Sequence, residues 1–318
     1  MFPGSSRHQM ASKALCAIVV LASALCLNAQ SSKLDLVVLS IPQDAPLRVA
    51  MIGFNRTSTD HSVELAAKAE SLLTASFGSD SRVTLVDRSI ALPAVKGLGD
   101  DGSINMSRDE AHKLGSAIGC DFFVIGKLEA FTRSERAAEE HEEALIGLMI
   151  VDARTGALAV FDFIGEKAAV RETAVAGLIK TLAARAPGYV DRMSRFQRAR
   201  SLVTPSTGNS AAETVEDIPD EGSPRAAGFK APAFLNRVKP DYTEAAERAD
   251  VTAVVEASAV FRASGEVGEI TIVRWAGFGL DESAEHAIRQ LKFKAATRDG
   301  KPVSVRATVR YNFRRLAQ

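Results

Sequence analysis

The strongest constraint on the fold is a run near the end of the chain in which apolar and polar residues alternate without a break. One set of alternate side chains is apolar: Val303, Val305, Ala307, Val309, Tyr311 and Phe313. The intervening set is polar or charged: Ser304, Arg306, Thr308, Arg310, Asn312 and Arg314. Successive side chains of a β-strand point to opposite faces, so this pattern predicts a long strand with one buried face. We therefore expect a one-sided antiparallel sheet packed on helices.

A short amphipathic helix precedes this strand. Its apolar side chains follow the i, i+3, i+4, i+7 spacing of one helical face: Ala284, Ala287, Ile288 and Leu291. Asp281 stands where an N-cap is expected, and Glu282 and Glu285 lie near the positive end of the helix dipole. The sequence DGKPV, residues 299–303, then predicts a turn into the final strand.

Residues 229–318 resemble the TonB C-terminal domain family over nearly their whole length. The features that carry the resemblance occur in order at suitable spacing: Pro240-x-Tyr242, Ala245 or Ala246 starting a first helix, an apolar strand over 251–261, a turn over 264–267, the strand EITIVR, Gly279-Leu280-Asp281, and Phe293 with Ala296. Two positions depart from the family pattern. Ala295 stands where the family usually has Pro, and Tyr242-Thr243 stands where it usually has a Tyr-Pro pair.

The resemblance implies that a partner protein binds by adding an extended strand beside the terminal strand, because an edge strand presents free N–H and C=O groups. The residues expected to bind the partner strand are Val303, Val305, Arg306, Thr308, Arg310, Tyr311, Asn312 and Phe313. The arginines either give a preference for an acidic peptide or simply keep an edge strand soluble, and the sequence favours neither reading.

Residues 33–203 alternate strand and helix signals and predict an α/β domain with a mixed sheet. Strands are expected over 47–54, 82–89 and 121–131, with a hairpin that turns at 152–156. Helices are expected over 61–77, from a capping box at Ser107 and Glu110 to about Gly119, and over about 168–184; residues 92–105 are expected to form a loop. The segment EAHKLGSAIGCDFFVIGKLE resembles the curli-secretion (CsgG-like) and TolB N-terminal-like envelope domains. This resemblance implies the fold and the compartment, and we do not extend it to pore formation.

The first 29 residues have the pattern of a secretory signal peptide. Basic residues precede an unbroken apolar run, 14–27, and Ala29 is expected to be the last residue before cleavage, so that the mature chain begins at Gln30. The alternative is an uncleaved membrane anchor. Leu precedes both Cys16 and Cys26, which argues against lipid attachment. A periplasmic location is expected, with inner-membrane anchoring as the alternative.

Composition changes at residues 204–228, where Pro, Ser, Gly, Asp and Glu dominate and apolar periodicity is lost. Such a segment predicts a flexible acidic linker between residues 33–203 and residues 229–318. The chain of 318 residues has 39 basic and 39 acidic residues, so its net charge gives no indication of nucleic-acid binding. We expect no nucleic-acid partner.

Several motifs that resemble chemical sites have simpler interpretations. The glycines of GLGDDG, at 97, 99 and 102, lie beside two aspartates that would repel phosphate, which favours a flexible loop. EEHEE, residues 139–143, is interpreted as a solvated charged turn rather than a zinc site. His61, His112 and His286 are far apart in sequence, and Cys120 lies in an apolar context, so a buried thiol is expected. RMSRFQRAR, residues 192–200, is interpreted as a solvated helix end. We expect no catalytic residue, no metal and no cofactor.

The sequence therefore predicts a non-enzymatic periplasmic adaptor that binds an outer-membrane or periplasmic protein through an extended peptide. One alternative is a membrane-anchored energy transducer for outer-membrane transport, which needs an uncleaved anchor and a long spacer. A fully extended linker of 25 residues would span only about 85 Å at ~3.4 Å per residue, which argues against that alternative. A second alternative, an envelope hydrolase, lacks a cluster of acids or histidines. Whether the terminal strands pair into a homodimer is left open.

Overall fold

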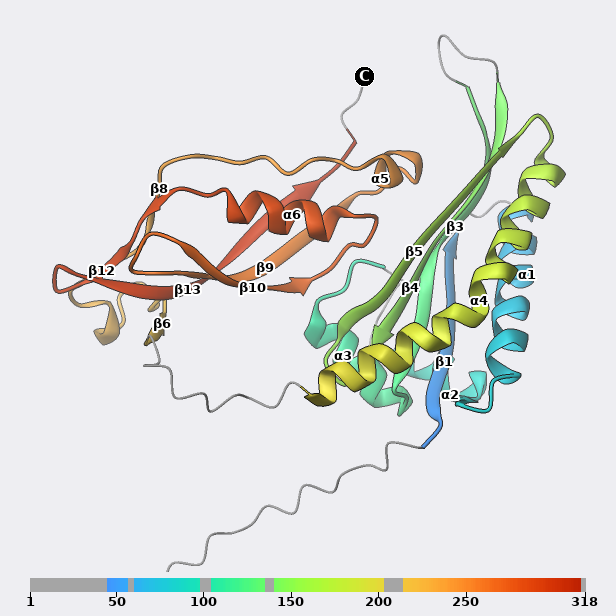
Figure 1. Cartoon of the computed structure of the whole chain (residues 1–318), viewed down its shortest axis with the longest axis horizontal. Helices are drawn as coiled ribbons and strands as arrows, with labels where there is room; N and C mark the ends of the chain where they lie inside the picture. Colours follow the sequence, from blue (N-terminus) through green and yellow to red (C-terminus); the bar gives the residue numbers. More distant parts are fainter. Residues whose placement is uncertain (1–44, 57–59, 98–103, 135–139, 203–213, 316–318) are drawn as a thin grey trace, which may run out of the picture. The chain divides into compact units, whose positions relative to one another are not determined.

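The computed structural model describes residues 45–56, 60–97, 104–134, 140–202 and 214–315, which all belong to one unit, Ala45–Gln318. A five-stranded sheet in the order β2-β1-β3-β4-β5 forms the centre of the N-terminal part (Figure 1). Its strands are β1 (Leu47–Arg56), β2 (Val83–Leu85), β3 (Phe122–Arg133), β4 (His141–Asp152) and β5 (Ala157–Ala168). β1 runs parallel to β2 and β3, whereas β3, β4 and β5 are antiparallel, so the sheet is mixed, as predicted.

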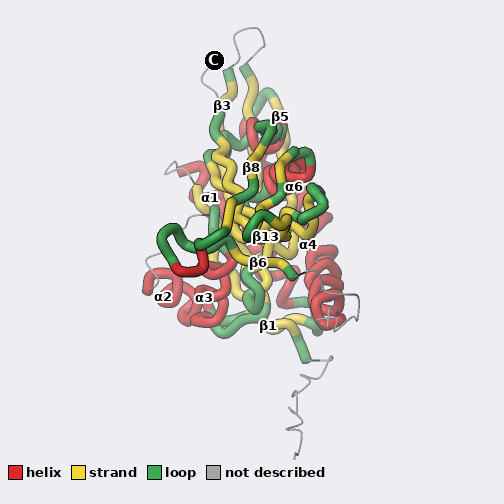
Figure 2. Tube along the Cα trace, turned by 90° about the vertical axis from the view of Figure 1, so that its left-hand side faces the viewer, coloured by secondary structure: helices red, strands yellow, loops and turns green. Residues whose placement is uncertain are grey.

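Four helices accompany this sheet: α1 (Asp60–Gly78), α2 (Arg88–Gly97), α3 (Arg108–Ile118) and α4 (Arg171–Leu202). α1 and α4 lie side by side, and buried side chains such as Leu73 and Leu182 form one core with Leu128 and Ile146 of the sheet (Figure 1). α2 and α3 lie next to each other and contribute to a second core (Figure 2). The predicted capping box of α3 is confirmed at Ser107 and Glu110, and Gly119 ends the helix in the left-handed conformation.

The prediction was wrong about residues 82–105, where only Val83–Leu85 are strand and Arg88–Gly97 form a helix. Asp87 begins this helix, since its carbonyl accepts hydrogen bonds from Ile90 and Ala91 N–H and its side chain accepts one from Ser89 N–H. Pro93, a residue that disfavours helix interiors, lies inside α2. Asp87 was the overlooked helix-start signal.

The prediction also ended α4 too early, near residue 184, whereas the observed helix continues through Pro187 and Gly188. A proline inside a helix removes one hydrogen bond and costs ~3 kcal/mol or more. Here the helix continues to Leu202, and Tyr189 beyond the proline is fully buried. The Tyr189 hydroxyl donates a hydrogen bond to Asp162 on β5 at 2.7 Å. Tertiary packing thus offsets the local preference.

The C-terminal part contains a second sheet in the order β10-β9-β13-β12-β7, with β6 paired to β13 off this path. Its strands are β6 (Val215–Asp217), β7 (Phe229–Lys230), β9 (Ala253–Phe261), β10 (Val267–Arg274), β12 (Ala296–Arg298) and β13 (Lys301–Phe313). Two helices, α5 (Glu244–Arg248) and α6 (Leu280–Arg289), a short 3₁₀ helix (Pro224–Ala226) and the small ladder of β8 (Ala233–Phe234) with β11 (Phe293–Lys294) accompany it. The pairs β10–β9, β9–β13 and β13–β12 are antiparallel, which confirms the predicted α+β arrangement.

Asp281 is not the N-cap of α6, contrary to the prediction. The cap position is Gly279, in the left-handed conformation, and Asp281 lies in the first turn. Its buried carboxylate accepts hydrogen bonds from the N–H groups of Ala276 and Gly277, at 2.8 and 2.9 Å. The carboxylate therefore fixes the loop before the helix, not the helix end.

Part of the segment predicted as a flexible linker is ordered. Residues 203–213 lie outside the described residues, but Val215–Asp217 form β6, which runs parallel to β13. Glu216 forms an ion pair with Arg298 on β12 at 2.6 Å. Acidic composition predicts solvation, and it does not reveal that a basic strand elsewhere in the chain is available for pairing.

The second core is shared between the N-terminal sheet and the C-terminal part. Phe278 is fully buried, and its ring centroid lies 5.0 Å from that of Phe161 and 6.0 Å from that of Phe163, both on β5. Opposite the ring is Gly147 on β4, where an added Cβ would lie 2.4 Å from Phe278 Cζ. The ring fits only because residue 147 has no side chain. We call the contact of Phe278 and Trp275 with the hairpin of β4 and β5 the joint.

Polar contacts reinforce the joint. The indole Nε1 of Trp275 donates a hydrogen bond to the carbonyl of Gly156 at 2.9 Å. The side-chain amide of Asn105 donates to the carbonyls of Val254 and Trp275 and accepts from Val254 N–H, at 2.8 to 2.9 Å. These groups satisfy one another, so the joint is packed and also hydrogen-bonded.

Candidate functional site: the open edge of the terminal strand

The two sides of β13 are occupied differently. β9 pairs with one side of the strand over Val305–Phe313. On the other side, β12 pairs with Lys301–Val303 and β6 with Ser304–Arg306. Within the part of the chain that the structure describes, no strand pairs with this side beyond Arg306. We call this side of residues 307–313 the open edge.

The opposite border of the C-terminal sheet is partly covered. Ser107 forms an isolated bridge with Arg274 at the end of β10. The Arg274 guanidinium donates to the carbonyl of Asn105 at 2.8 Å and forms an ion pair with Glu110 at 3.2 Å. A partner strand would meet fewer obstacles at the open edge of β13 than at this border.

The side chains of β13 alternate as the sequence predicts. Arg306, Thr308, Arg310 and Asn312 are exposed, whereas Val305 and Phe313 are buried. Ser304 is the exception on the polar face: it is buried, and its hydroxyl accepts a hydrogen bond from Ala263 N–H at 2.7 Å. The arginines therefore border the open edge with their charged groups in solvent.

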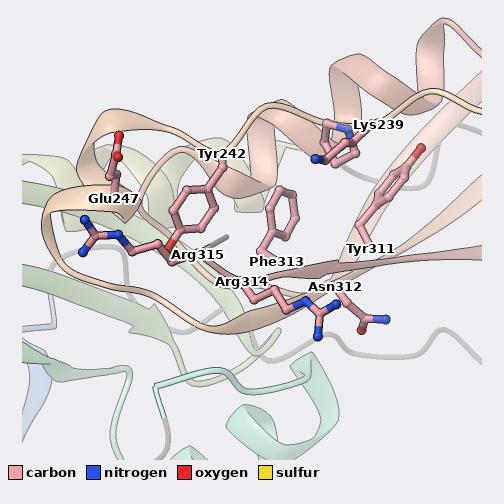
Figure 3. A pocket seen from close by; sticks show the side chains of 9 residues that line it. Lys239, Tyr242, Glu247, Tyr311, Asn312, Phe313, Arg314 and Arg315 are labelled. Atoms are coloured by element: carbon pink, nitrogen blue, oxygen red, sulfur yellow. The ribbon is translucent and has the colours of Figure 1, made fainter. Parts of the chain in front are cut away.

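A groove of about 630 Å³ adjoins the end of β13 (Figure 3). Its lining combines basic and aromatic side chains with one acid, and it consists of Lys239, Pro240, Tyr242, Glu247, Tyr311, Asn312, Phe313, Arg314 and Arg315. Three of these side chains are cationic and one is anionic, so the groove is suited to an acidic ligand with apolar groups.

Tyr242 fixes one wall of this groove. Its hydroxyl donates to the carbonyl of Val251 at 2.7 Å, with that of Ala246 3.2 Å away. Burial, together with the nearby Asp250 carboxylate, raises the pKa of Tyr242 above its ordinary value, so the phenol stays protonated as a donor. Thr243, which stands where the related family usually has Pro, accepts a hydrogen bond from Ala246 N–H at 3.2 Å and caps α5.

The structure divides the predicted partner-binding residues into two groups. Val303, Val305 and Arg306 already have β12 or β6 on the side where a partner would pair. The remaining five lie along the open edge: Thr308, Arg310, Tyr311, Asn312 and Phe313. The sequence did not single out Lys239, Glu247 or Arg315, which enter the groove from outside the strand. The Pro240-x-Tyr242 motif contributed to the family resemblance, but the sequence did not assign it to the site.

The acidic run 139–143 is not a solvated turn in its described part. His141, Glu142 and Glu143 begin β4, and Glu143 is fully buried between Arg133, at 2.5 Å, and Arg248, at 2.5 Å. Burial would raise the pKa of Glu143, but the two guanidiniums more than offset this effect and lower it. Since Arg248 lies on α5, this ion-pair cluster is another link to the C-terminal part.

The other motifs also have structural positions. Burial raises the pKa of the Cys120 thiol to about 12, which leaves it protonated at neutral pH. His112 Nδ1 lies 2.9 Å from the carbonyl of Ala153. Arg200 pairs with the buried carboxylate of Asp152, which corrects the interpretation of residues 192–200 as a solvated helix end. Residues 98–103, with most of GLGDDG, lie outside the described residues, as does the side chain of His61.

The predicted cleavage site at Ala29 and Gln30 lies outside the described residues. None of the helices in the described part of the chain is long and apolar enough to cross a membrane. Among the described residues there is no group of three or more His, Cys, Asp or Glu that could hold a metal ion.

Comparison with known proteins identifies the C-terminal part. Residues 238–314 match the family model described as Gram-negative bacterial TonB protein C-terminal. The predicted TonB-type domain is thereby confirmed, and the match fits an envelope-associated protein. No curated protein matches the chain.

Solved structures with partial likeness include the hypothetical protein CT253 from Chlamydia trachomatis, at 16% identity and a TM-score of 0.31, covering 46% of this chain and 98% of that one. The lipoprotein GNA1162 from Neisseria meningitidis has 16% identity and a TM-score of 0.32, covering 46% and 99%. The LpoB C-terminal domain from Salmonella enterica has 13% identity and a TM-score of 0.27, covering 38% and 82%. We draw no functional conclusion from likeness at these scores. The resemblance of residues 33–203 to curli-secretion and TolB N-terminal-like domains stays a prediction.

Proposed function

We propose that this protein is a non-enzymatic periplasmic adaptor that binds an extended peptide of another envelope protein by strand addition at residues 307–313. The single observation that carries the proposal is the open edge itself. One side of the strand is held by β9 over nine registered residue pairs, from Val305 to Phe313, while over residues 307–313 the other side is without a strand neighbour in the described structure. Such an edge offers a rigid ladder of backbone groups to an incoming strand.

The groove at the end of β13 supports the same function. An extended peptide lying along the open edge would run toward Arg314 and Arg315, where basic and aromatic side chains surround a cavity of about 630 Å³. Backbone pairing would give the affinity, and the groove would select the peptide's side chains. The exposed Arg306 and Arg310 would favour an acidic sequence.

The test is amide hydrogen exchange measured by NMR with an extended octapeptide of alternating Thr and Glu. In an antiparallel strand the N–H groups point alternately to the two sides. Amides of 307–313 that face β9 are already protected, so the probe should protect the remaining, alternate amides. The matched control is an octapeptide of alternating Thr and Lys, which the arginines should repel. Uniform protection, or protection confined to other surfaces, would refute strand addition.

A further inference from the structure

We propose that the acidic strand β6 acts as an internal competitor for the edge of β13, and that the partner is an acidic extended segment that enters parallel to β13 and displaces β6. This inference rests on the proposed function. It adds the charge of the bound peptide, the direction in which the peptide strand runs, and the way in which binding is regulated.

The first observation is the pairing of β6. Val215, Glu216 and Asp217 lie opposite Ser304, Val305 and Arg306, parallel to β13 and on the side away from β9. β6 therefore occupies the same side of the strand as the open edge, directly before residue 307. An incoming strand that used the full edge would have to take the place of β6.

The second observation is the chemistry of the segment. Glu216 accepts hydrogen bonds from two nitrogens of Arg298, Nε at 2.8 Å and Nη2 at 2.6 Å. Asp217 stands in register with Arg306. The edge thus already holds an extended acidic strand, which indicates the type of ligand that it accepts: acidic side chains beside Arg298 and Arg306.

The third observation is that β6 is held weakly. It has only three residues, and their burial alternates exposed, intermediate, exposed. Val215 keeps 36% of its surface exposed and Ile218, just after the strand, keeps 39%, so neither apolar side chain belongs to the buried core. β13 itself stays paired with β9 along nine residue pairs. A competitor can therefore remove β6 without disturbing the strand that receives it.

The experiment measures binding of the fluorescent Thr-Glu octapeptide to the full chain and to three variants. In E216A the internal segment loses its ion pair while Arg298 stays available to the probe, so affinity should rise about fivefold, as expected for a partly exposed pair of ~1 kcal/mol. D220A removes the same charge from an exposed position of the segment outside the strand and should bind like the wild type. Replacing Val215–Asp217 by Gly-Ser-Gly should raise the affinity further than E216A does.

Amide exchange then distinguishes the two proposals. In the Gly-Ser-Gly variant the probe should protect those amides of Ser304–Arg306 that face away from β9, together with the alternate amides of 307–313. If the probe protects 307–313 with equal affinity in all variants, the competitor role of β6 is refuted and the proposed function stands. If no variant shows alternate protection on β13, both proposals are wrong. Equal gains in E216A and D220A would also refute the competitor role, since they would reflect net charge alone.

Discussion

The joint between the N-terminal sheet and the TonB-type domain makes the sharpest quantitative prediction. Phe278 is fully buried against the strands β4 and β5, and truncating a buried Phe to Ala typically costs about 3–5 kcal/mol. We expect F278A to lower the free energy of unfolding by that amount. G147A should also be destabilising, by about 1–3 kcal/mol, because its Cβ would lie 2.4 Å from the Phe278 ring.

The double variant F278A/G147A is the decisive measurement. Once the ring is gone, the Cβ at position 147 has room, so the double variant should be about as stable as F278A alone. The two substitutions would then have a coupling energy of about 1–3 kcal/mol. The control is G188A, at an exposed helical position where an added Cβ meets no atom within 4 Å. There Gly to Ala should stabilise the helix by up to about 1 kcal/mol.

Urea unfolding provides the assay, because the only tryptophan of the chain, Trp275, lies at the joint and is 1% exposed. Its fluorescence reports on the joint, and circular dichroism reports on the whole chain. If F278A loosens the joint, the fluorescence transition should come at lower urea than the circular dichroism transition. Additive effects of F278A and G147A, or a G147A variant that behaves like G188A, would refute the packing argument.

Two further predictions concern buried carboxylates. Burial raises the pKa of Asp281 from 3.8 to about 6, so the folded state binds this proton more tightly, and the free energy of unfolding should fall by about 2 kcal/mol as pH rises from 4 to above 6. D281N should remove this contribution, and urea titrations at pH 4 to 7 that give parallel profiles for both proteins would contradict it. E143Q should cost about 3–5 kcal/mol at pH 7, since Arg133 and Arg248 would lose their buried charge partner. E285Q, at an exposed ion pair, should change stability by no more than about 0.5 kcal/mol, and similar losses in both variants would contradict the cluster's role.

Several elements could be predicted because their signals are local. The capping box at Ser107 and Glu110 needs only four consecutive residues, and it is present as predicted. The hairpin of β4 and β5 turns at Asp152–Gly156, where Gly156 has a φ of 64° that favours glycine. The exposed and buried faces of β13 follow directly from its alternation. In each case the signal lies within one short stretch of consecutive residues.

The candidate site was only partly predictable. The strand and its charged face came from the pattern of residues 303–313. Which side of the strand is open depends on where β12, just before the turn, and β6, from a distant part of the chain, pair with it. The acidic composition of residues 204–228 predicted a linker, because residues of these types are usually exposed to solvent. The position of Arg298, 82 residues from Glu216, is what holds that segment on the sheet.

The sequence by itself therefore determined the hydrophobic periodicity of the strands and helices, the turns and most helix starts. These local features specified the mixed N-terminal sheet and the TonB-type sheet. Only the tertiary structure decided how far α4 continues past Pro187, where β6 docks, and that Phe278 enters the space left by Gly147. The physical reason is that periodicity specifies which face of an element is buried. It does not specify the element that covers that face, since this depends on the shapes and charges of distant segments.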